Sequence, residues 1–351
     1  MTRLALVGVT KTFARTVALR NVDLAVAAGE LVAVLGPSGS GKTTLLRAIA
    51  GLDVLDSGTV AFDGVDVTQC DARARNVGMV FQDFALFPHV SVRENIAFGL
   101  RARHVAGRDA RVLAAARQAR IEPLLERKPA TLSGGEKQRV AIARVLACAP
   151  VAYLFDEPFA SLDTPLRATL RVEFAELRAQ LDAAMLFVTH DQGEALALGD
   201  RIAVMRGGSI EQIGTADELL AAPATRFVAE FVGLPPRSVI DGAIVRGAFV
   251  AHGCEFVRVA APDGPAALAI PPEGFDLRAG GRLAGTVRLI ETIGAGKYAS
   301  ILIGTETLVV ALGDHVPRAG ERVSVDVRAA FSNGWLFDAA GRRIAEASRA
   351  A

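Results

Sequence analysis

The feature that most constrains the fold of this chain is residues 36–43, which read Gly-Pro-Ser-Gly-Ser-Gly-Lys-Thr. They match the pattern GxxxxGK[ST], follow an apolar run at Leu31–Leu35 and precede a helical pattern. A strand, such a loop and a helix in that order turn backbone N–H groups toward an anion at the helix N-terminus. The sequence therefore predicts a phosphate-binding loop, called the P-loop below, within a mainly parallel α/β sheet.

The P-loop predicts the ligand as well as the fold. Lys42 is expected to reach the β- and γ-phosphates of a nucleotide, and the Thr43 hydroxyl is expected to bind Mg²⁺. The predicted nucleotide-binding residues of this loop are Gly36, Ser38, Gly39, Ser40, Gly41, Lys42, Thr43 and Thr44.

A second candidate site lies where the apolar run at residues 151–155 ends in Asp156-Glu157-Pro158. Ligands of open α/β sheets bind at the carboxyl ends of the strands. We expect Asp156 to hold Mg²⁺ through water and Glu157 to act as the general base that orients the attacking water. The alternative is a pair of solvated turn carboxylates.

Residues 132–139, Leu-Ser-Gly-Gly-Glu-Lys-Gln-Arg, precede another helical pattern and predict a second anion nest formed by Ser133, Gly134 and Gly135. This segment resembles the LSGGQ signature of ABC ATPases, with Glu136 where glutamine is commoner. We call it the signature. The resemblance implies that the nucleotide is ATP and that the chain hydrolyses it with Mg²⁺.

Further segments resemble ABC motifs in the family order. Phe81-Gln82 resembles the Q-loop, residues 160–163 resemble the D-loop, and Thr189-His190-Asp191 resembles the switch-histidine segment. Phe13 lies where relatives place the aromatic residue that stacks on adenine. The resemblance implies that Gln82 contacts Mg²⁺ and takes part in catalysis.

The same resemblance implies a homodimer in which ATP is held between the P-loop of one copy, including Lys42, and Ser133 of the other. His190 is then expected to hold the γ-phosphate and to position water with Glu157. Asp163 is expected to reach across the interface. Such an interface closes only with its ligand.

A narrower resemblance covers residues 81–89 and 224–233, which are similar to bacterial importers for maltose, polyamines, sulfate and iron(III). It implies an α/β P-loop NTPase core with a helical subdomain, followed by a small all-β, OB-like barrel called a TOBE domain. One departure is residues 270–273, Ile-Pro-Pro-Glu, where relatives usually carry Arg-Pro-Glu. The partners implied are membrane permease subunits and, indirectly, a solute-binding protein, with no nucleic acid.

The predicted secondary structure changes near residue 235, from strands alternating with helices to a series of short strands. We predict an ATPase domain at 1–234, with its helical subdomain at about 90–150, and a TOBE-like β domain at 235–351. Asn333-Gly334 is a hairpin signal, Ser91 with Glu94 is a capping box, and Pro165 follows Thr164 as a predicted N-cap. Strands are predicted at 4–9, 31–35, 77–81, 151–155, 185–189 and 201–205, and then at 238–250, 255–259, 285–290, 298–303, 307–312 and 322–327.

Composition excludes several other classes of protein. The 39 basic and 38 acidic residues give no basic footprint for nucleic acid. No apolar run approaches the roughly 20 residues that span a bilayer, and no signal peptide is evident. The three cysteines are far apart, with no CxxC pair. We expect a protein with reduced thiols, bound peripherally to the cytoplasmic face of the bacterial inner membrane.

The predicted function is the ATP-hydrolysing subunit of an ABC importer, whose solute is expected to be a small ion or polyamine (iron(III), sulfate, polyamine or phosphonate). A sugar importer, an ABC ATPase with a mainly regulatory C-terminal domain, and one acting on DNA or ribosomes are the alternatives. Gln82 is expected to couple nucleotide state to a permease groove. Phe84, Leu86 and Phe87 either line that groove or belong to the core.

Overall fold

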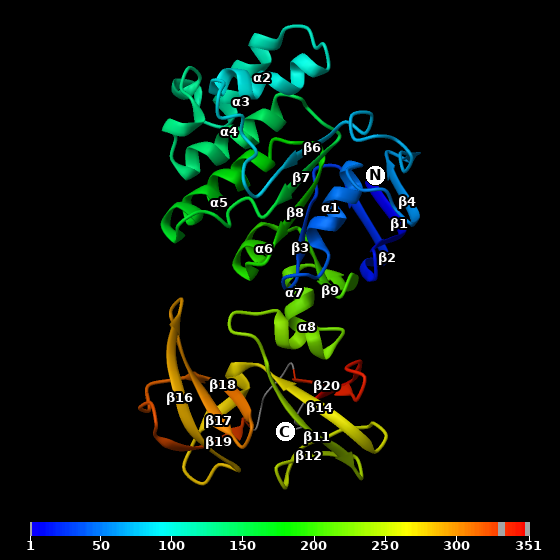
Figure 1. Cartoon of the computed structure of the whole chain (residues 1–351). Helices are drawn as coiled ribbons and strands as arrows, with labels where there is room; N and C mark the ends of the chain where they lie inside the picture. The colour runs from blue at the N-terminus through cyan, green and yellow to red at the C-terminus, as the bar shows by residue number, and fades with distance from the viewer. Residues whose placement is uncertain (1, 329–333, 348–351) are drawn as a thin grey trace. The chain divides into compact units, whose positions relative to one another are not determined.

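The computed structural model describes residues 2–328 and 334–347. Its chain forms two compact units, Met1–Thr215 and Ala216–Ala351 (Figure 1). Within the described ranges, no helix combines the length and the apolar character needed to cross a membrane.

A six-stranded sheet forms the centre of the first unit, in the order β10-β9-β3-β8-β7-β6. All neighbours are parallel except β9 and β10. Strand β3 is buried on both faces, which is why it reads as a continuous apolar run. The strands are β3 (Leu31–Leu35), β6 (Val77–Val80), β7 (Ala152–Asp156), β8 (Ala184–Thr189), β9 (Arg201–Arg206) and β10 (Ser209–Gly214). The five strands predicted in this sheet are confirmed to within one residue.

A four-stranded antiparallel sheet lies beside it, in the order β2-β1-β4-β5. Its strands are β1 (Thr2–Phe13), β2 (Thr16–Ala27), β4 (Ser57–Phe62) and β5 (Val65–Asp66). Helix α1 (Lys42–Ala50) packs between the two sheets (Figure 1), with Leu45 and Ile49 in the same buried cluster as Leu4 and Val34. Only β1 of this sheet was predicted, and it is longer than expected.

Helices fill the region predicted as a helical insertion. They are α2 (Val92–Ala102), α3 (Arg108–Gln118), η1 (Glu122–Leu124), η2 (Pro129–Thr131) and α4 (Gly134–Leu146). The capping box at α2 is confirmed: Ser91 Oγ accepts from the N–H of Glu94 at 3.2 Å, and Glu94 Oε2 accepts from the N–H of Ser91 at 3.0 Å. Helices α2 and α3 both pack against α4, which carries the signature at its start.

Helices α5 (Thr164–Arg178) and α6 (Gln192–Leu198) follow the strands that bear the functional loops. The predicted N-cap at Thr164 is wrong. Asp163 is the N-cap, because its carboxylate accepts a hydrogen bond from the N–H of Leu166 at 2.9 Å and Thr164 is already helical. The D-loop therefore ends as the cap of α5.

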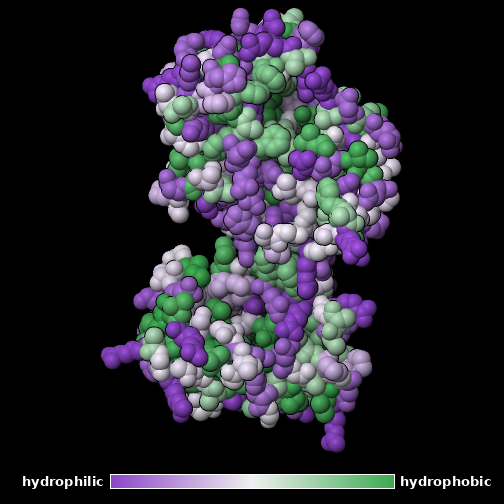
Figure 2. Space-filling model, in the orientation of Figure 1, coloured by the Kyte–Doolittle hydropathy of each residue, from purple (hydrophilic) through white to green (hydrophobic). Residues whose placement is uncertain are grey.

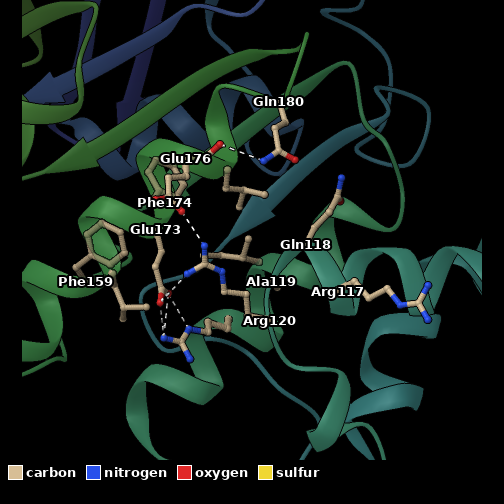
Figure 3. A pocket seen from close by; sticks show the side chains of 13 residues that line it. Arg117, Gln118, Ala119, Arg120, Phe159, Glu173, Phe174, Glu176 and Gln180 are labelled. Carbon is tan, nitrogen blue, oxygen red and sulfur yellow. Dashed lines mark hydrogen bonds and ion pairs between the residues drawn. The ribbon is translucent and has the colours of Figure 1, made fainter.

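Ion pairs join the helical region to α5 around a cavity of about 370 Å³ (Figure 3). Glu173 on α5 pairs with Arg139 of α4 at 2.9 Å and with Arg120 at 3.6 Å, and Glu176 pairs with Arg120 at 2.8 Å. The apolar side of the cavity is formed by Ile142, Phe159, Leu170, Phe174 and Leu177. These contacts hold the helix of the signature against the D-loop helix.

The second unit begins with α7 (Ala216–Ala221) and α8 (Arg226–Phe231). Its described strands form sheets in the orders β13-β12-β11-β14-β20-β21 and β15-β19-β16-β17-β18 around a shared core. They are β11 (Ser238–Val245), β12 (Ala248–Ala251), β13 (Cys254–Arg258), β14 (Gly264–Ile270), β15 (Phe275–Leu277), β16 (Leu283–Ile293), β17 (Gly296–Ile303), β18 (Glu306–Leu312), β19 (Arg322–Val327), β20 (Gly334–Asp338) and β21 (Arg343–Ala347), with η3 at Pro272–Gly274. An α/β P-loop core followed by a β domain is thus the fold.

The predicted hairpin turn at Asn333 lies outside the described residues. Other features of this unit differ from the expectations. Strands β14, β15 and β21 were not predicted, and the single strand predicted at 238–250 is two antiparallel strands, β11 and β12. Ala229 of α8 packs on Ala269 and Phe337, so α8 belongs to this compact unit although it precedes residue 235.

Candidate nucleotide site

One cavity of about 600 Å³ brings together most of the predicted site residues. It is lined by Thr16, Val17, Ala18, Ser38, Gly39, Ser40, Gly41, Lys42, Thr43, Thr44, Gln82, Glu157 and His190. The P-loop, the Q-loop and the loops after β7 and β8 therefore meet at the carboxyl edge of the parallel sheet, where ligands of such sheets bind.

The P-loop fits the space around it only with glycine at two positions. A Cβ on Gly36 would lie 2.4 Å from the carbonyl oxygen of Met205. Gly41 has φ +103°, and a Cβ there would lie 2.4 Å from the carbonyl oxygen of Ala18. Both neighbours are backbone atoms that cannot move aside, so the loop is a closely packed cradle of N–H groups.

Two buried polar side chains of the P-loop have hydrogen-bond donors that could bind an anion. Lys42 is 6% exposed, and its Nζ donates to the carbonyl oxygens of Gly36 and Pro37 at 2.8 and 3.0 Å. Burial lowers the pKa of Lys42, and the carboxylates of Glu157 and Asp156 oppose that shift. Ser40 Oγ is buried and has no hydrogen-bond partner among the described residues. A phosphate group supplies what both side chains lack.

Oxygen atoms suited to Mg²⁺ lie at the edge of this cradle. Thr43 Oγ1 donates to Asp156 Oδ1 at 3.1 Å, and Asp156 is 7% exposed at the end of β7. Burial raises the pKa of Asp156, and the Thr43 hydrogen bond opposes that shift. Gln82 lines the same cavity and is exposed. A hydroxyl, a carboxylate and an amide oxygen are the donor types that Mg²⁺ accepts, so these residues fit the ion.

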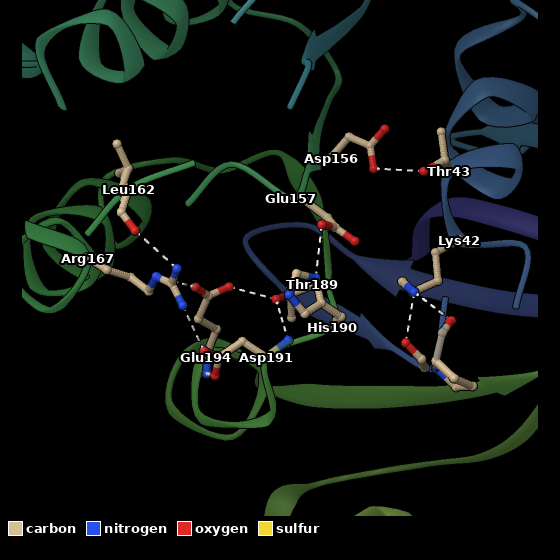
Figure 4. A network of polar contacts seen from close by, with 12 residues as sticks. Lys42, Thr43, Asp156, Glu157, Leu162, Arg167, Thr189, His190, Asp191 and Glu194 are labelled. Carbon is tan, nitrogen blue, oxygen red and sulfur yellow. Dashed lines mark hydrogen bonds and ion pairs between the residues drawn. The ribbon is translucent and has the colours of Figure 1, made fainter. Parts of the chain in front are cut away.

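Glu157 and His190 form a direct pair, with Glu157 Oε2 and His190 Nδ1 at 2.9 Å (Figure 4). Glu157 has φ 45°, a left-handed conformation that is strained for a residue with a side chain. Its N–H is held by the carbonyl oxygen of Val188 on β8 at 3.0 Å. The strained backbone aims the carboxylate into the cavity, where the ring of His190 is also exposed.

The signature residues do not line this cavity. Ser133 is the N-cap of α4: its Oγ accepts from the N–H of Glu136 at 3.3 Å, and Glu136 Oε2 accepts from the N–H of Ser133 at 2.7 Å. The hydrogen bond from the Ser133 backbone is the main cause of a lowered pKa of Glu136. Ser133 and Gly134 are exposed, whereas Gly135 is buried. Asp163 is exposed and also lies outside the cavity lining.

Phe13 lies at the end of β1, 46% exposed, with Lys11 Nζ 5.0 Å from the centre of its ring. It is not among the residues that line the cavity, whereas Thr16, Val17 and Ala18 at the start of β2 are. Sequence reasoning missed these three. Their place depends on how β2 passes Gly41, and no local pattern marks it.

Arg144 of α4 was also missed. Its guanidinium donates to the carbonyl oxygens of Phe84 and Ala85 at 2.9 and 2.6 Å, and both residues have positive φ. Burial lowers the pKa of Arg144. This side chain fixes the Q-loop, but its partners are backbone atoms, so no residue pattern points to them.

An apolar groove of about 390 Å³, here called the Q-loop groove, adjoins that loop. Its lining includes Phe81, Phe87, Phe98, Arg103 and Cys148. Figure 2 shows hydrophobic side chains among hydrophilic ones on the face over α2, α4 and β6. Of the three apolar residues left open by the sequence, Phe87 lines the groove, whereas Phe84 and Leu86 are half-buried beside it.

Comparison with known proteins agrees with this geometry. The family model described as ABC transporter matches residues 19–160. The chain is 42% identical to the sn-glycerol-3-phosphate import ATP-binding protein UgpC of Chromohalobacter salexigens, over 98% of this chain and 96% of that protein. It is 47% identical to the sulfate/thiosulfate import ATP-binding protein CysA of Caulobacter vibrioides, over 78% of this chain and 82% of that protein.

A solved structure is also similar. The dimeric structure of a post-hydrolysis state of the ATP-binding cassette MJ0796, bound to ADP and Pi, aligns with a TM-score of 0.55 and 34% identity. The alignment covers 60% of this chain and 98% of that chain.

Proposed function

The chain belongs to the ABC transporter family as an ATP-binding, ATP-hydrolysing import subunit, and we propose that it energises uptake of a small oxyanion such as an organic phosphate ester. It uses ATP and Mg²⁺. The observation that carries the assignment of ATP hydrolysis is the cavity that gathers the P-loop, Gln82, Glu157 and His190.

Binding of ATP is assigned to the cradle. The N–H groups of the P-loop and the Ser40 hydroxyl receive phosphate oxygens, and Lys42 exchanges its two carbonyl partners for the β- and γ-phosphates. Thr43, Asp156 and Gln82 would hold Mg²⁺, which would supply positive charge to neutralise the charge developing on the phosphates. Thr16, Val17 and Ala18 border the same space, and Phe13 contributes to it only if its ring turns from Lys11 toward the base.

Hydrolysis is assigned to the pair of Glu157 and His190. Glu157 accepts a hydrogen bond from the attacking water and so orients it. His190 Nδ1 lies 2.9 Å from that carboxylate and fixes it, and the exposed ring is assigned to contact the γ-phosphate. Because Glu157 is held in a strained conformation by Val188, its position is set before substrate arrives.

The second half of the site is assigned to another copy of the chain. Ser133, Gly134 and Gly135 lie outside the cavity, and we assign them to grip the γ-phosphate bound to a partner copy, with Asp163 at the same interface. Exposure of Ser133 and Gly134 at the start of α4 supports this assignment. The dimeric form of the similar ATP-binding cassette supports it too.

We assign permease subunits to the Q-loop groove and this chain to the cytoplasmic face of the membrane. The groove is apolar, and Gln82 and the Q-loop connect it to the nucleotide cavity. Cys148 lines the groove and Cys70 is exposed elsewhere, so alkylation can test docking. Docked permease should protect Cys148 from a thiol reagent and leave Cys70 reactive. Equal protection of both would contradict this site.

The solute is inferred from relatives rather than from residues of this chain. The preference for a small ion or polyamine is replaced, because the relative named for sn-glycerol-3-phosphate aligns over nearly its full length. That solute and sulfate both carry a tetrahedral oxyanion. With permease and binding protein reconstituted, glycerol 3-phosphate should stimulate ATPase activity more than sulfate, and spermidine should not. Stimulation by spermidine alone would contradict the proposal.

We also propose a functional division at residues 234/235, with the helical subdomain at about 90–150 and a TOBE-like domain at 235–351. The strand-rich composition from Ser238 onward supports it. We assign the solute-binding protein an indirect role, through the permease.

Glu157→Gln tests the proposed hydrolysis. It keeps the shape of the side chain but removes the base, so steady-state ATP turnover should fall at least about a hundredfold. ATP-driven dimerisation, measured by size exclusion with light scattering, should persist because the phosphate contacts remain. Normal turnover in this variant would contradict the assigned mechanism.

A further inference from the structure

Arg167 on α5 connects two loops that the proposed function uses separately (Figure 4). Its Nη2 donates to the carbonyl oxygen of Leu162 in the D-loop at 3.1 Å. Its Nη1 donates to Asp191 Oδ2, next to His190, at 3.2 Å. One rigid guanidinium therefore spans the D-loop and the switch-histidine loop.

The contacts beyond Asp191 fix both residues that flank His190. Asp191 donates its N–H to Thr189 Oγ1 at 3.0 Å, and its Oδ1 accepts from the N–H of Glu194 at 3.0 Å. Thr189 Oγ1 donates to Glu194 Oε2 at 2.6 Å. Glu194 is 2% exposed and lies 3.8 Å from Arg167 Nε, so a positive charge faces a buried carboxylate. A shift of Arg167 thus changes the backbone on each side of His190.

The other end of this connection reaches the signature. A Cβ on Gly134 would lie 3.1 Å from Cδ2 of Leu162, and one on Gly135 would lie 3.0 Å from Cδ2 of Leu166. The two signature glycines therefore pack on the leucines that flank Asp163 along the chain. Arg167 follows Leu166 directly and bonds to Leu162, so movement of the signature is passed to it through close packing.

We propose that Arg167 is a positioning residue that couples the signature to His190 within one chain. This inference rests on the proposed ATP sandwich. There, the signature senses the nucleotide held by the partner copy, and His190 acts on the nucleotide held by its own P-loop. Arg167 makes hydrolysis at one site depend on occupancy of the other.

The chain supplies a matched control on the same helix. Arg178 also forms a pair of hydrogen bonds to a carboxylate, that of Asp200, at 2.9 and 3.1 Å. Among the described residues, the side-chain hydrogen bonds of Arg178 go to Asp200 and not to the D-loop or the switch-histidine loop. Arg178→Ala therefore removes a comparable ion pair from α5 without disturbing the proposed connection.

The test is steady-state ATPase activity of the full-length chain as a function of ATP concentration. Arg167→Ala should lower kcat by about 10- to 100-fold, the cost of a misplaced catalytic group, with KM changed less than about twofold. Its Hill coefficient for ATP should fall to about 1, because the sites no longer communicate. Arg167→Lys should recover part of kcat, since an ammonium keeps one of the two contacts. Arg178→Ala should leave kcat, KM and the Hill coefficient unchanged.

Asp191→Asn provides an independent variant if Arg167→Ala does not fold. The asparagine oxygen can still cap α6, but the charged partner of Arg167 is lost, so the same decrease in kcat and Hill coefficient is expected at smaller size. Equal kcat in Arg167→Ala and Arg178→Ala, or an unchanged Hill coefficient, would overturn the coupling. If Glu157→Gln is inactive while Arg167→Ala is normal, only the coupling fails. If Glu157→Gln hydrolyses ATP normally, the proposed function itself fails.

Discussion

The P-loop (residues 36–43) and the signature (residues 132–139) both present serine and glycine at a helix N-terminus, but their surroundings differ. In the P-loop, Lys42 and Ser40 are 6% and 3% exposed, and backbone atoms leave no room for a Cβ at Gly41. In the signature, Ser133 is exposed and its hydroxyl is bonded to its own helix. One nest is enclosed and has unpaired capacity, whereas the other is capped and faces outward.

This difference indicates how each nest meets the same anion. The enclosed nest can hold a phosphate with no help from another molecule, because lysine, hydroxyl and amide groups surround one cavity. The exposed nest offers only a helix terminus, which in water binds an anion weakly unless something else presents it. If the difference is functional, P-loop changes should remove nucleotide binding by one chain, while signature changes should leave it and weaken dimerisation.

Gly41→Ala should have the largest effect. The new methyl group would lie 2.4 Å from the carbonyl oxygen of Ala18, and φ +103° is unfavourable for alanine. We expect ATP affinity to fall at least about a hundredfold, since the cradle cannot form (about 1.4 kcal/mol per factor of ten). Fluorescent-nucleotide titration measures the ATP affinity.

Gly39→Ala is the matched control. Its φ is +77°, but no atom lies within 4 Å of an added Cβ, so the loss of ATP affinity should be much smaller. Similar losses in both would show that backbone strain, not the close approach, decides.

Ser133→Ala, in the signature, should leave ATP binding by the single chain nearly unchanged and lower turnover. Loss of the N-cap should cost about 1 kcal/mol of stability. ATP affinity of the single chain should change less than about twofold, while turnover falls about tenfold because the partner's γ-phosphate loses a contact. Thr225→Ala removes a comparable cap, since Thr225 Oγ1 accepts from the N–H of Val228 at 3.3 Å in the second unit, and should leave turnover intact. A loss of single-chain ATP affinity in Ser133→Ala would place the signature in the wrong site.

How far the sequence predicts this molecule depends on whether partners are local. The P-loop, Gln82, Glu157 and His190 could be predicted to meet, because each follows a strand of one parallel sheet and such ends share an edge. Arg144 could not, since the backbone carbonyl groups that it binds lie far from it along the chain and come near only after folding. Arg167 could not, since its carboxylate partner Asp191 lies on a loop after another strand. Their residue type is common on any helix surface.

The strands show the same limit. Strand β3 is buried on both faces and reads as an unbroken apolar run, so its bounds were predictable. Strand β2 alternates irregularly between exposed and buried residues and was missed.

Glu173→Gln tests what keeps the exposed nest in place. Glu173 pairs with Arg139 at 2.9 Å and with Arg120 at 3.6 Å, and its side chain is 22% exposed (Figure 3). Losing the charged partner should lower the free energy of unfolding by about 1–2 kcal/mol. ATP affinity should be unchanged. Glu176→Gln is the control, because that carboxylate is 56% exposed and its pair with Arg120 should contribute at most about 0.5 kcal/mol. Urea unfolding of both variants measures the difference, and equal values would contradict a specific role for Glu173.

Glu136→Gln should have the smallest effect and a distinctive pH dependence. The N–H of Ser133 bonds to the carboxylate and lowers the pKa of Glu136 from its ordinary value of 4.5. A lowered folded-state pKa contributes stability above pH 4.5 that is lost as the pH falls through the folded value. Wild type should therefore lose about 1–2 °C more of its Tm than the variant between about pH 6 and pH 3. At neutral pH the amide oxygen of glutamine still accepts from Ser133, so turnover should be unchanged.

Glu94→Gln removes the same kind of carboxylate from the capping box of α2 and should show the same pH dependence. A pH effect in one variant and not the other would mean that the signature carboxylate does more than cap its helix.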